Sequence, residues 1–212
     1  MNNTKILHRQ IERSQRLTEL DLTEQELLLA VEQGQAAAAN CTENNPPLQR
    51  SIVAWGESIR SLRESKIPKG WKRYDEAHQQ PLVLNPKANM AITAAAGDEH
   101  TGVKDRNPAT KSGKGSLTES AIKSNSLKYT LWGDIRKPDT RETWILLFHR
   151  DRETLEIRSE LSLPVKMNNE KQVDQWLERI ILSSIPFSGT PAKVFDEQAK
   201  TPEVHVEVKR RA

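Results

Sequence analysis

The chain has 212 residues, of which 35% are hydrophobic and 29% are charged, which is enough for one domain of ordinary size with a modest core. The single cysteine, Cys41, excludes an internal disulfide and any multi-cysteine metal site. The longest wholly apolar run, residues 144–148, is far shorter than the roughly 20 residues that a membrane-spanning helix needs. Because the N-terminus also lacks the apolar stretch of a secretory signal, the sequence predicts a cytoplasmic protein without a membrane partner.

The formal net charge of +3 belongs to the middle of the chain. Residues 51–140 hold 15 Lys and Arg against 10 Asp and Glu, whereas the remaining parts are acidic or balanced. Clustered basic side chains of this kind are typical of proteins that contact nucleic acid or another polyanion. They also occur on ordinary solvated faces, so the charge pattern leaves both interpretations open.

The first 65 residues predict three helices. Apolar residues recur at helical spacing over residues 3–20, and Thr23 with Glu26 forms a capping box that opens a second helix reaching about residue 40. A third helix is expected over residues 48–65, with Ile52, Trp55, Ile59 and Leu62 on one apolar stripe. We predict that residues 1–45 form a helical arm that docks on a partner or on the protein's own sheet. Deleting this arm is expected to leave a folded remainder.

The apolar period changes from 3.6 to 2 after the third helix. Residues 82–84 and 92–96 predict a β-hairpin, and the Gly-rich residues 97–116 predict a long loop. Ser116 with Glu119 forms a second capping box, which opens a short helix. A strand is expected near residues 129–132.

The C-terminal half predicts a second hairpin and a final strand. Residues 144–148 are apolar on both faces, and they pair with residues 155–163, in which Glu160 and its polar neighbours alternate with leucine and isoleucine. Residues 170–182 fit a helix that gives way to a strand, although a strand alone also fits. Alternating valines over residues 204–208 predict a last strand.

This order of elements predicts an α+β fold. N-terminal helices are followed by an antiparallel sheet of two or more hairpins, with one or two interposed helices. The expected organisation is a helical arm, residues 1–45, followed by an α+β domain, residues 46–212, with the long loop at residues 97–116.

Two stretches of the basic middle predict an anion site. The string Gly113, Lys114, Gly115, Ser116 stands at the start of a helix, where backbone amides favour an anion, although it does not match a nucleotide-binding P-loop. Around Trp71, cationic and aromatic side chains interleave, as in proteins that stack a base and contact its phosphates. The predicted site comprises Arg63, Lys66, Lys69, Trp71, Lys72, Arg73, Lys111, Gly113, Lys114, Gly115 and Ser116. The alternatives are a plain Gly-rich linker and a Trp71 that covers the hairpin.

Three neighbouring residues of the long loop carry the only candidate catalytic chemistry. Asp98, Glu99 and His100 are residue types that ligate a divalent cation or transfer protons, which defines an alternative as a metal-dependent hydrolase or nuclease. A polar turn after a strand is the simpler explanation of the three residues. No nucleophile, redox or cofactor motif accompanies them, so the sequence predicts no cofactor and no metal.

The leading hypothesis is a non-enzymatic accessory subunit of a larger assembly. Its basic middle contacts a partner, for which a protein is predicted first and nucleic acid second.

Overall fold

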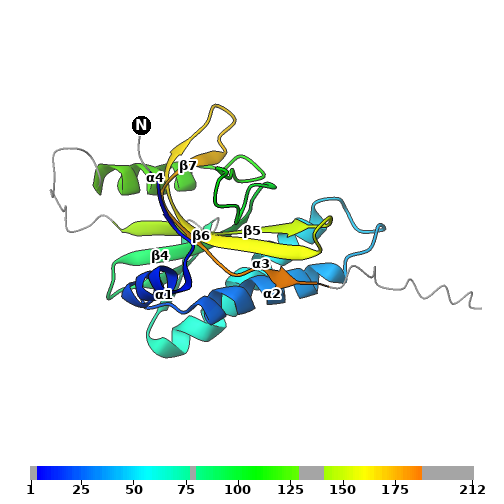
Figure 1. Ribbon diagram of the computed structural model, residues 1–212, viewed down its shortest axis with the longest axis horizontal. Helices are drawn as coiled ribbons and strands as arrows, with labels where there is room; N and C mark the ends of the chain where they lie inside the picture. Colours follow the sequence, from blue (N-terminus) through cyan, green and yellow to red (C-terminus); the bar gives the residue numbers. More distant parts are fainter. Residues whose placement is uncertain (1–3, 77–79, 129–140, 188–212) are drawn as a thin grey trace, which may run out of the picture.

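The computed structural model describes residues 4–76, 80–128 and 141–187. One sheet runs through the molecule, with three N-terminal helices on one face and a fourth helix on the other (Figure 1). The α+β class predicted from the sequence is therefore confirmed. The predicted strands near residues 129–132 and 204–208 lie outside the described residues.

The helices follow the predicted pattern. They are α1 (Gln10–Glu19), α2 (Glu24–Ala39), α3 (Gln49–Lys66), a short 3-10 turn η1 (Ile67–Lys69) and α4 (Ser116–Lys128). The predicted capping box of α2 is present: the Thr23 N–H donates to Glu26 Oε2 at 2.9 Å, and the Glu26 N–H donates to Thr23 Oγ1 at 3.3 Å. None of these helices, within the part of the chain that is described, combines the length and apolar content of a membrane span.

The sheet is mixed rather than purely antiparallel. Its order is β1-β7-β6-β5-β4-β3-β2, and β8 pairs with β6. The strands are β1 (Lys5–Leu7), β2 (Lys72–Glu76), β3 (Gln80–Asn85), β4 (Met90–Ala96), β5 (Glu142–Asp151), β6 (Glu156–Met167), β7 (Val173–Ile181) and β8 (Ile185–Pro186). Both predicted hairpins, β3/β4 and β5/β6, are antiparallel, but β1/β7 and β4/β5 are parallel. The link from β4 to β5 contains α4, and such a crossover returns the chain in the same direction.

The helix favoured at the start of residues 170–182 is absent, because β7 is a strand throughout. Its pairing with β6 shifts register three times between Leu163 and Met167. These bulges place Val173 and Trp176 in one core cluster and Ile180 in the other. Because a bulge inserts a residue into a strand, the resulting apolar spacing imitates a helix.

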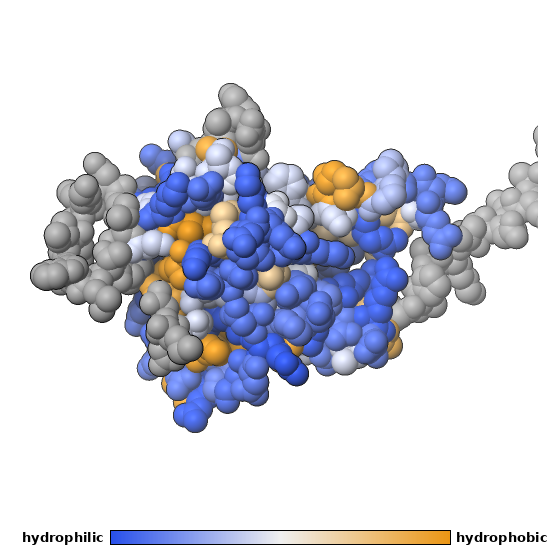
Figure 2. All heavy atoms as spheres, turned by 90° about the horizontal axis from the view of Figure 1, so that it is seen from above, coloured by the Kyte–Doolittle hydropathy of each residue, from blue (hydrophilic) through white to orange (hydrophobic). Residues whose placement is uncertain are grey.

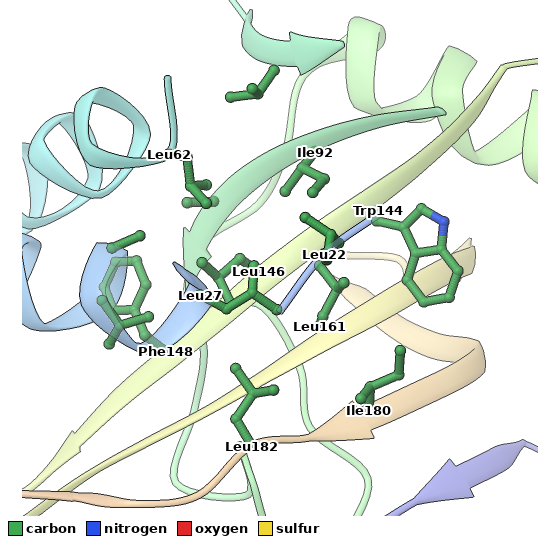
Figure 3. Packing of buried hydrophobic residues seen from close by; sticks show 14 of the residues in the cluster. Leu22, Leu27, Leu62, Ile92, Trp144, Leu146, Phe148, Leu161, Ile180 and Leu182 are labelled. Carbon is green, nitrogen blue, oxygen red and sulfur yellow. The ribbon is translucent and has the colours of Figure 1, made fainter. Parts of the chain in front are cut away.

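The main core lies between the sheet and the three N-terminal helices (Figure 3). Leu27 of α2 and Leu62 of α3 are fully buried in the same cluster as Leu146 of β5. A smaller cluster, which includes Ile122 of α4 and Trp176, covers the other face. Contacts therefore cross residue 45, because buried residues of α1 and α2 belong to the same core as residues of the sheet. Whether residues 1–45 also dock on a partner stays a prediction.

Candidate anion-binding surface

Several cations of the first predicted cluster are used inside the protein. Lys66 is 1% exposed, and its Nζ donates to the Asp21 carbonyl at 2.6 Å and lies 3.3 Å from both carboxylate oxygens of Glu26. Lys69 donates to the same carboxylate at 2.7 Å. Although burial opposes ionisation of Glu26, hydrogen bonds from Lys69 and the Thr23 N–H and the charge of Lys66 lower its pKa. These lysines join α3 to α2.

Trp71 belongs to the same internal network. Its side chain is 3% exposed, its indole N–H donates to Asp21 Oδ2 at 2.8 Å, and the Lys66 ammonium lies 4.8 Å from its ring centroid. The Trp71 ring is thus part of the main core, and a role for it in stacking a base stays a prediction.

Arg63 and Arg73 share one carboxylate. Arg73 Nε lies 2.6 Å from Asp75 Oδ2, and Arg63 donates both to Asp75 and to the Leu82 carbonyl. The hydrogen bonds from Arg63 and then Arg73 lower the pKa of Asp75. Lys72 is exposed and forms no salt bridge with a described residue. This end of the predicted site is thus largely neutralised.

The second predicted stretch is held against β7. The Thr110 N–H donates to the Val173 carbonyl at 2.9 Å, and the Lys114 N–H donates to the Lys171 carbonyl at 2.8 Å. Gly113 passes so close to this turn that a Cβ there would lie 2.7 Å from the Glu170 carbonyl oxygen. The close approach explains why glycine occupies this position.

This contact gathers five lysines, which we call the lysine surface: Lys111, Lys114, Lys123, Lys166 and Lys171. Lys123 pairs with Glu119 at 3.0 Å, whereas the other four form no salt bridge with any described residue. Glu119 and Glu170 are the neighbouring acids, so the local charge remains positive. Figure 2 views the molecule from the side of α4, where hydrophilic residues cover most of the surface. Lys166 and Lys171 were not predicted, because they come from a part of the sequence with balanced charge. Lys123 belongs to the basic middle but was not among the predicted site residues.

A cavity of about 380 Å³ lies at the start of α4, and we call it the α4 cavity. It opens where β3 and β4 stop pairing: their register ends at Val83 and Ile92, and the next hydrogen-bonding position on β3 is taken by Pro81, which has no N–H. Burial lowers the pKa of Lys114, which lines this cavity. The lining residues are Trp55, Gln80, Pro81, Thr93, Ala94, Ala95, Gly113, Lys114, Gly115, Ser116, Leu117, Thr118 and Ile145.

Asp98, Glu99 and His100 lie in one loop. The contacts of Asp98 and Glu99 stabilise the conformation of this loop. Asp98 accepts hydrogen bonds from the N–H groups of His100 at 3.1 Å and Ala109 at 3.0 Å. The Glu99 carbonyl accepts from Arg158 at 2.7 Å. In the described ranges, no three His, Cys, Asp or Glu residues are placed to hold a metal ion. The carboxylate of Asp98 closes the loop, and a catalytic role for the three residues stays a prediction.

A buried ion pair, which no sequence pattern predicted, holds the rest of this loop. Arg179 Nη2 lies 2.6 Å from Glu160 Oε2, and both side chains are almost completely buried. Arg179 also donates to the carbonyls of Val103 and Arg106, and the Gly102 N–H donates to Glu160. The predicted loop is therefore packed onto the sheet.

Comparisons with protein-family models, with curated proteins and with solved structures found no match for this chain.

Proposed function

We propose that this protein is a non-enzymatic binding protein that contacts a polyanion, with nucleic acid as the ligand class, through the lysine surface. The proposal keeps the role expected from the sequence, an accessory subunit of a cytoplasmic assembly. The observation that carries it is the contrast between the cations of the first predicted cluster and those of the lysine surface. Lys66, Lys69, Arg63 and Arg73 are matched by Glu26 and Asp75, whereas four lysines of the lysine surface have no salt bridge among the described residues.

Lysines without a salt bridge suit contacts with phosphate groups. An ammonium group is a compact charge that neutralises a phosphate without reading the base next to it. Binding of this kind releases counterions from the nucleic acid, so it weakens as salt is added. The ligand is therefore expected to be recognised by charge and not by sequence.

Reversing three of these charges tests the proposal. The variant Lys111→Glu, Lys114→Glu, Lys171→Glu is expected to bind a fluorescent single-stranded oligonucleotide on the order of 100-fold more weakly at about 0.1 M salt, because about three phosphate contacts are lost. The measurement is fluorescence anisotropy.

The matched control carries the same change of net charge at exposed positions that belong neither to the lysine surface nor to the lining of the neighbouring cavities: Lys87→Glu, Lys104→Glu, Arg152→Glu. It should bind within a few-fold of the unaltered protein. Equal weakening of both triple variants would show that net charge, and not the lysine surface, governs binding, and would contradict the proposal.

A protein partner is the second candidate function, and one observation favours it. Leu48 and Ile52 at the start of α3 are 72% and 58% exposed, although the sequence pattern placed Ile52 on the buried stripe. Exposed apolar residues on one helix face are typical of surfaces that dock on another protein. If no nucleic acid binds even at the lowest salt, this second function replaces the first.

A further inference from the structure

The α4 cavity combines groups suited to the two halves of a nucleotide. At one side stand the ammonium of Lys114 and the N-terminal turn of α4, a helix of 13 residues. The N–H groups of a first turn and the helix dipole favour an anion. At another side stands the indole ring of Trp55 from α3. The volume of about 380 Å³ lies within the range of roughly 300–1,000 Å³ that is usual for ligand sites.

Trp55 differs from the other described tryptophans. The indole N–H groups of Trp71, Trp144 and Trp176 donate to Asp21, Glu142 and the Pro108 carbonyl, and all three rings are buried in the core. Trp55 is only half-buried, and its N–H has no hydrogen-bond partner among the residues described. Its ring lines the α4 cavity and also a neighbouring cavity of about 550 Å³ between α3 and β2. An aromatic ring placed in this way offers a surface on which a base stacks.

The side chain of Gln80 gives independent evidence for a ligand, because one of its hydrogen-bonding groups lacks a partner among the described residues. Its Nε2 makes a long hydrogen bond of 3.5 Å to Thr118 Oγ1, which joins β3 to α4 across the cavity. Its Oε1 is buried and receives no hydrogen bond from the described residues. Buried acceptors are nearly always satisfied, so a ligand that brings a donor, such as a base amino group or a sugar hydroxyl, would complete the site.

We propose that the α4 cavity receives one nucleotide of a single-stranded nucleic acid, with its base against Trp55 and its phosphate at Lys114 and the first turn of α4. This inference rests on the proposed function and specifies its ligand. A single strand is required because the bases of a duplex are stacked and paired, and only an unstacked base reaches a recessed tryptophan. The remaining lysines of the lysine surface contact the neighbouring phosphates.

Three probes distinguish a site for a single-stranded nucleotide from a surface that binds any polyanion. The full chain is titrated with oligo(dT), with a duplex of the same length, and with inorganic polyphosphate, which carries charge without bases. The inference predicts that oligo(dT) binds at least several-fold more tightly than the other two. It also predicts that Trp55→Leu weakens oligo(dT) binding about 5- to 150-fold, the contribution of one stacked base, and leaves polyphosphate binding unchanged. Ile52→Ala, on the same helix but outside the cavity, serves as the control and should bind like the unaltered protein.

A second pair of variants tests the phosphate end without disturbing the core. Gly115 lines the cavity, and a Cβ added there meets no heavy atom within 4 Å, so a larger residue fits. Gly115→Glu and Gly115→Gln add side chains of the same shape, but only glutamate repels a phosphate. The glutamate variant is expected to bind oligo(dT) at least about tenfold more weakly than the glutamine variant.

The outcomes are distinguishable. If polyphosphate and oligo(dT) bind equally well and neither Trp55→Leu nor the Gly115 pair alters the preference, the nucleotide site is overturned while the polyanion function stands. If none of the three probes binds, the proposed function itself fails.

Discussion

Replacing Glu160 with Gln is expected to lower the free energy of unfolding by about 3–5 kcal/mol, the usual cost of leaving one charge of a buried ion pair uncompensated. Arg179 is 1% exposed, and its other contacts are the neutral carbonyls of Val103 and Arg106, which cannot replace a carboxylate. Urea denaturation of the full chain measures the change through its midpoint and slope.

The exposed pair of Lys123 and Glu119 provides the control. Its geometry is good, with 3.0 Å between the charged atoms, but both side chains are largely exposed. Because solvent screens such pairs, Glu119→Gln should leave the midpoint unchanged. A Glu160→Gln midpoint equal to that of the unaltered protein would show that the buried pair does not stabilise the fold.

Deletion of residues 1–45 is expected to unfold the remainder, which reverses the expectation drawn from the sequence. The deletion removes Leu17 and Leu27 from the main core, together with β1 and its pairing to β7. It also removes Glu26, so that Lys66 loses its only carboxylate partner in the described part of the chain. Each buried leucine that is lost costs about 2–5 kcal/mol. The summed cost of several such leucines exceeds the roughly 5–15 kcal/mol by which a typical domain is stable.

Thermal melting followed by circular dichroism tests this second prediction. The full chain should melt cooperatively, and the shortened chain should show no transition and little residual structure. A cooperative transition in residues 46–212 would instead establish the arm as a separable unit, as predicted from the sequence.

Local patterns predicted local structure well. The capping box of α2 and the two hairpins depend on residues close in sequence, so they can be predicted without knowledge of the fold. The parallel pairing of β4 with β5 depends on a crossover that no alternation of residues encodes. The helix expected at the start of β7 was wrong because bulges disturb the period of two.

The candidate site was predictable only in part. The glycines and Lys114 at the start of α4 were found because a helix start next to glycine and lysine is a local signal. Lys166 and Lys171 join them through the turn between β6 and β7, about 50 residues later in the chain, which only the fold reveals. In the same way, Glu160 alternates with leucines like a solvent-facing residue, yet it is buried because the loop containing Val103 covers that face.

The dependence of binding on salt is the sharpest test of contact between phosphate groups and the lysine surface. Anisotropy titrations of the full chain with a single-stranded oligonucleotide between about 50 and 200 mM salt give the slope of log K against log salt concentration. If three to four lysines of the lysine surface each neutralise one phosphate, the predicted slope is about −2 to −3, at roughly −0.7 for each phosphate on a single strand. A slope near zero, or no binding at the lowest salt, would show that the lysine surface does not bind nucleic acid.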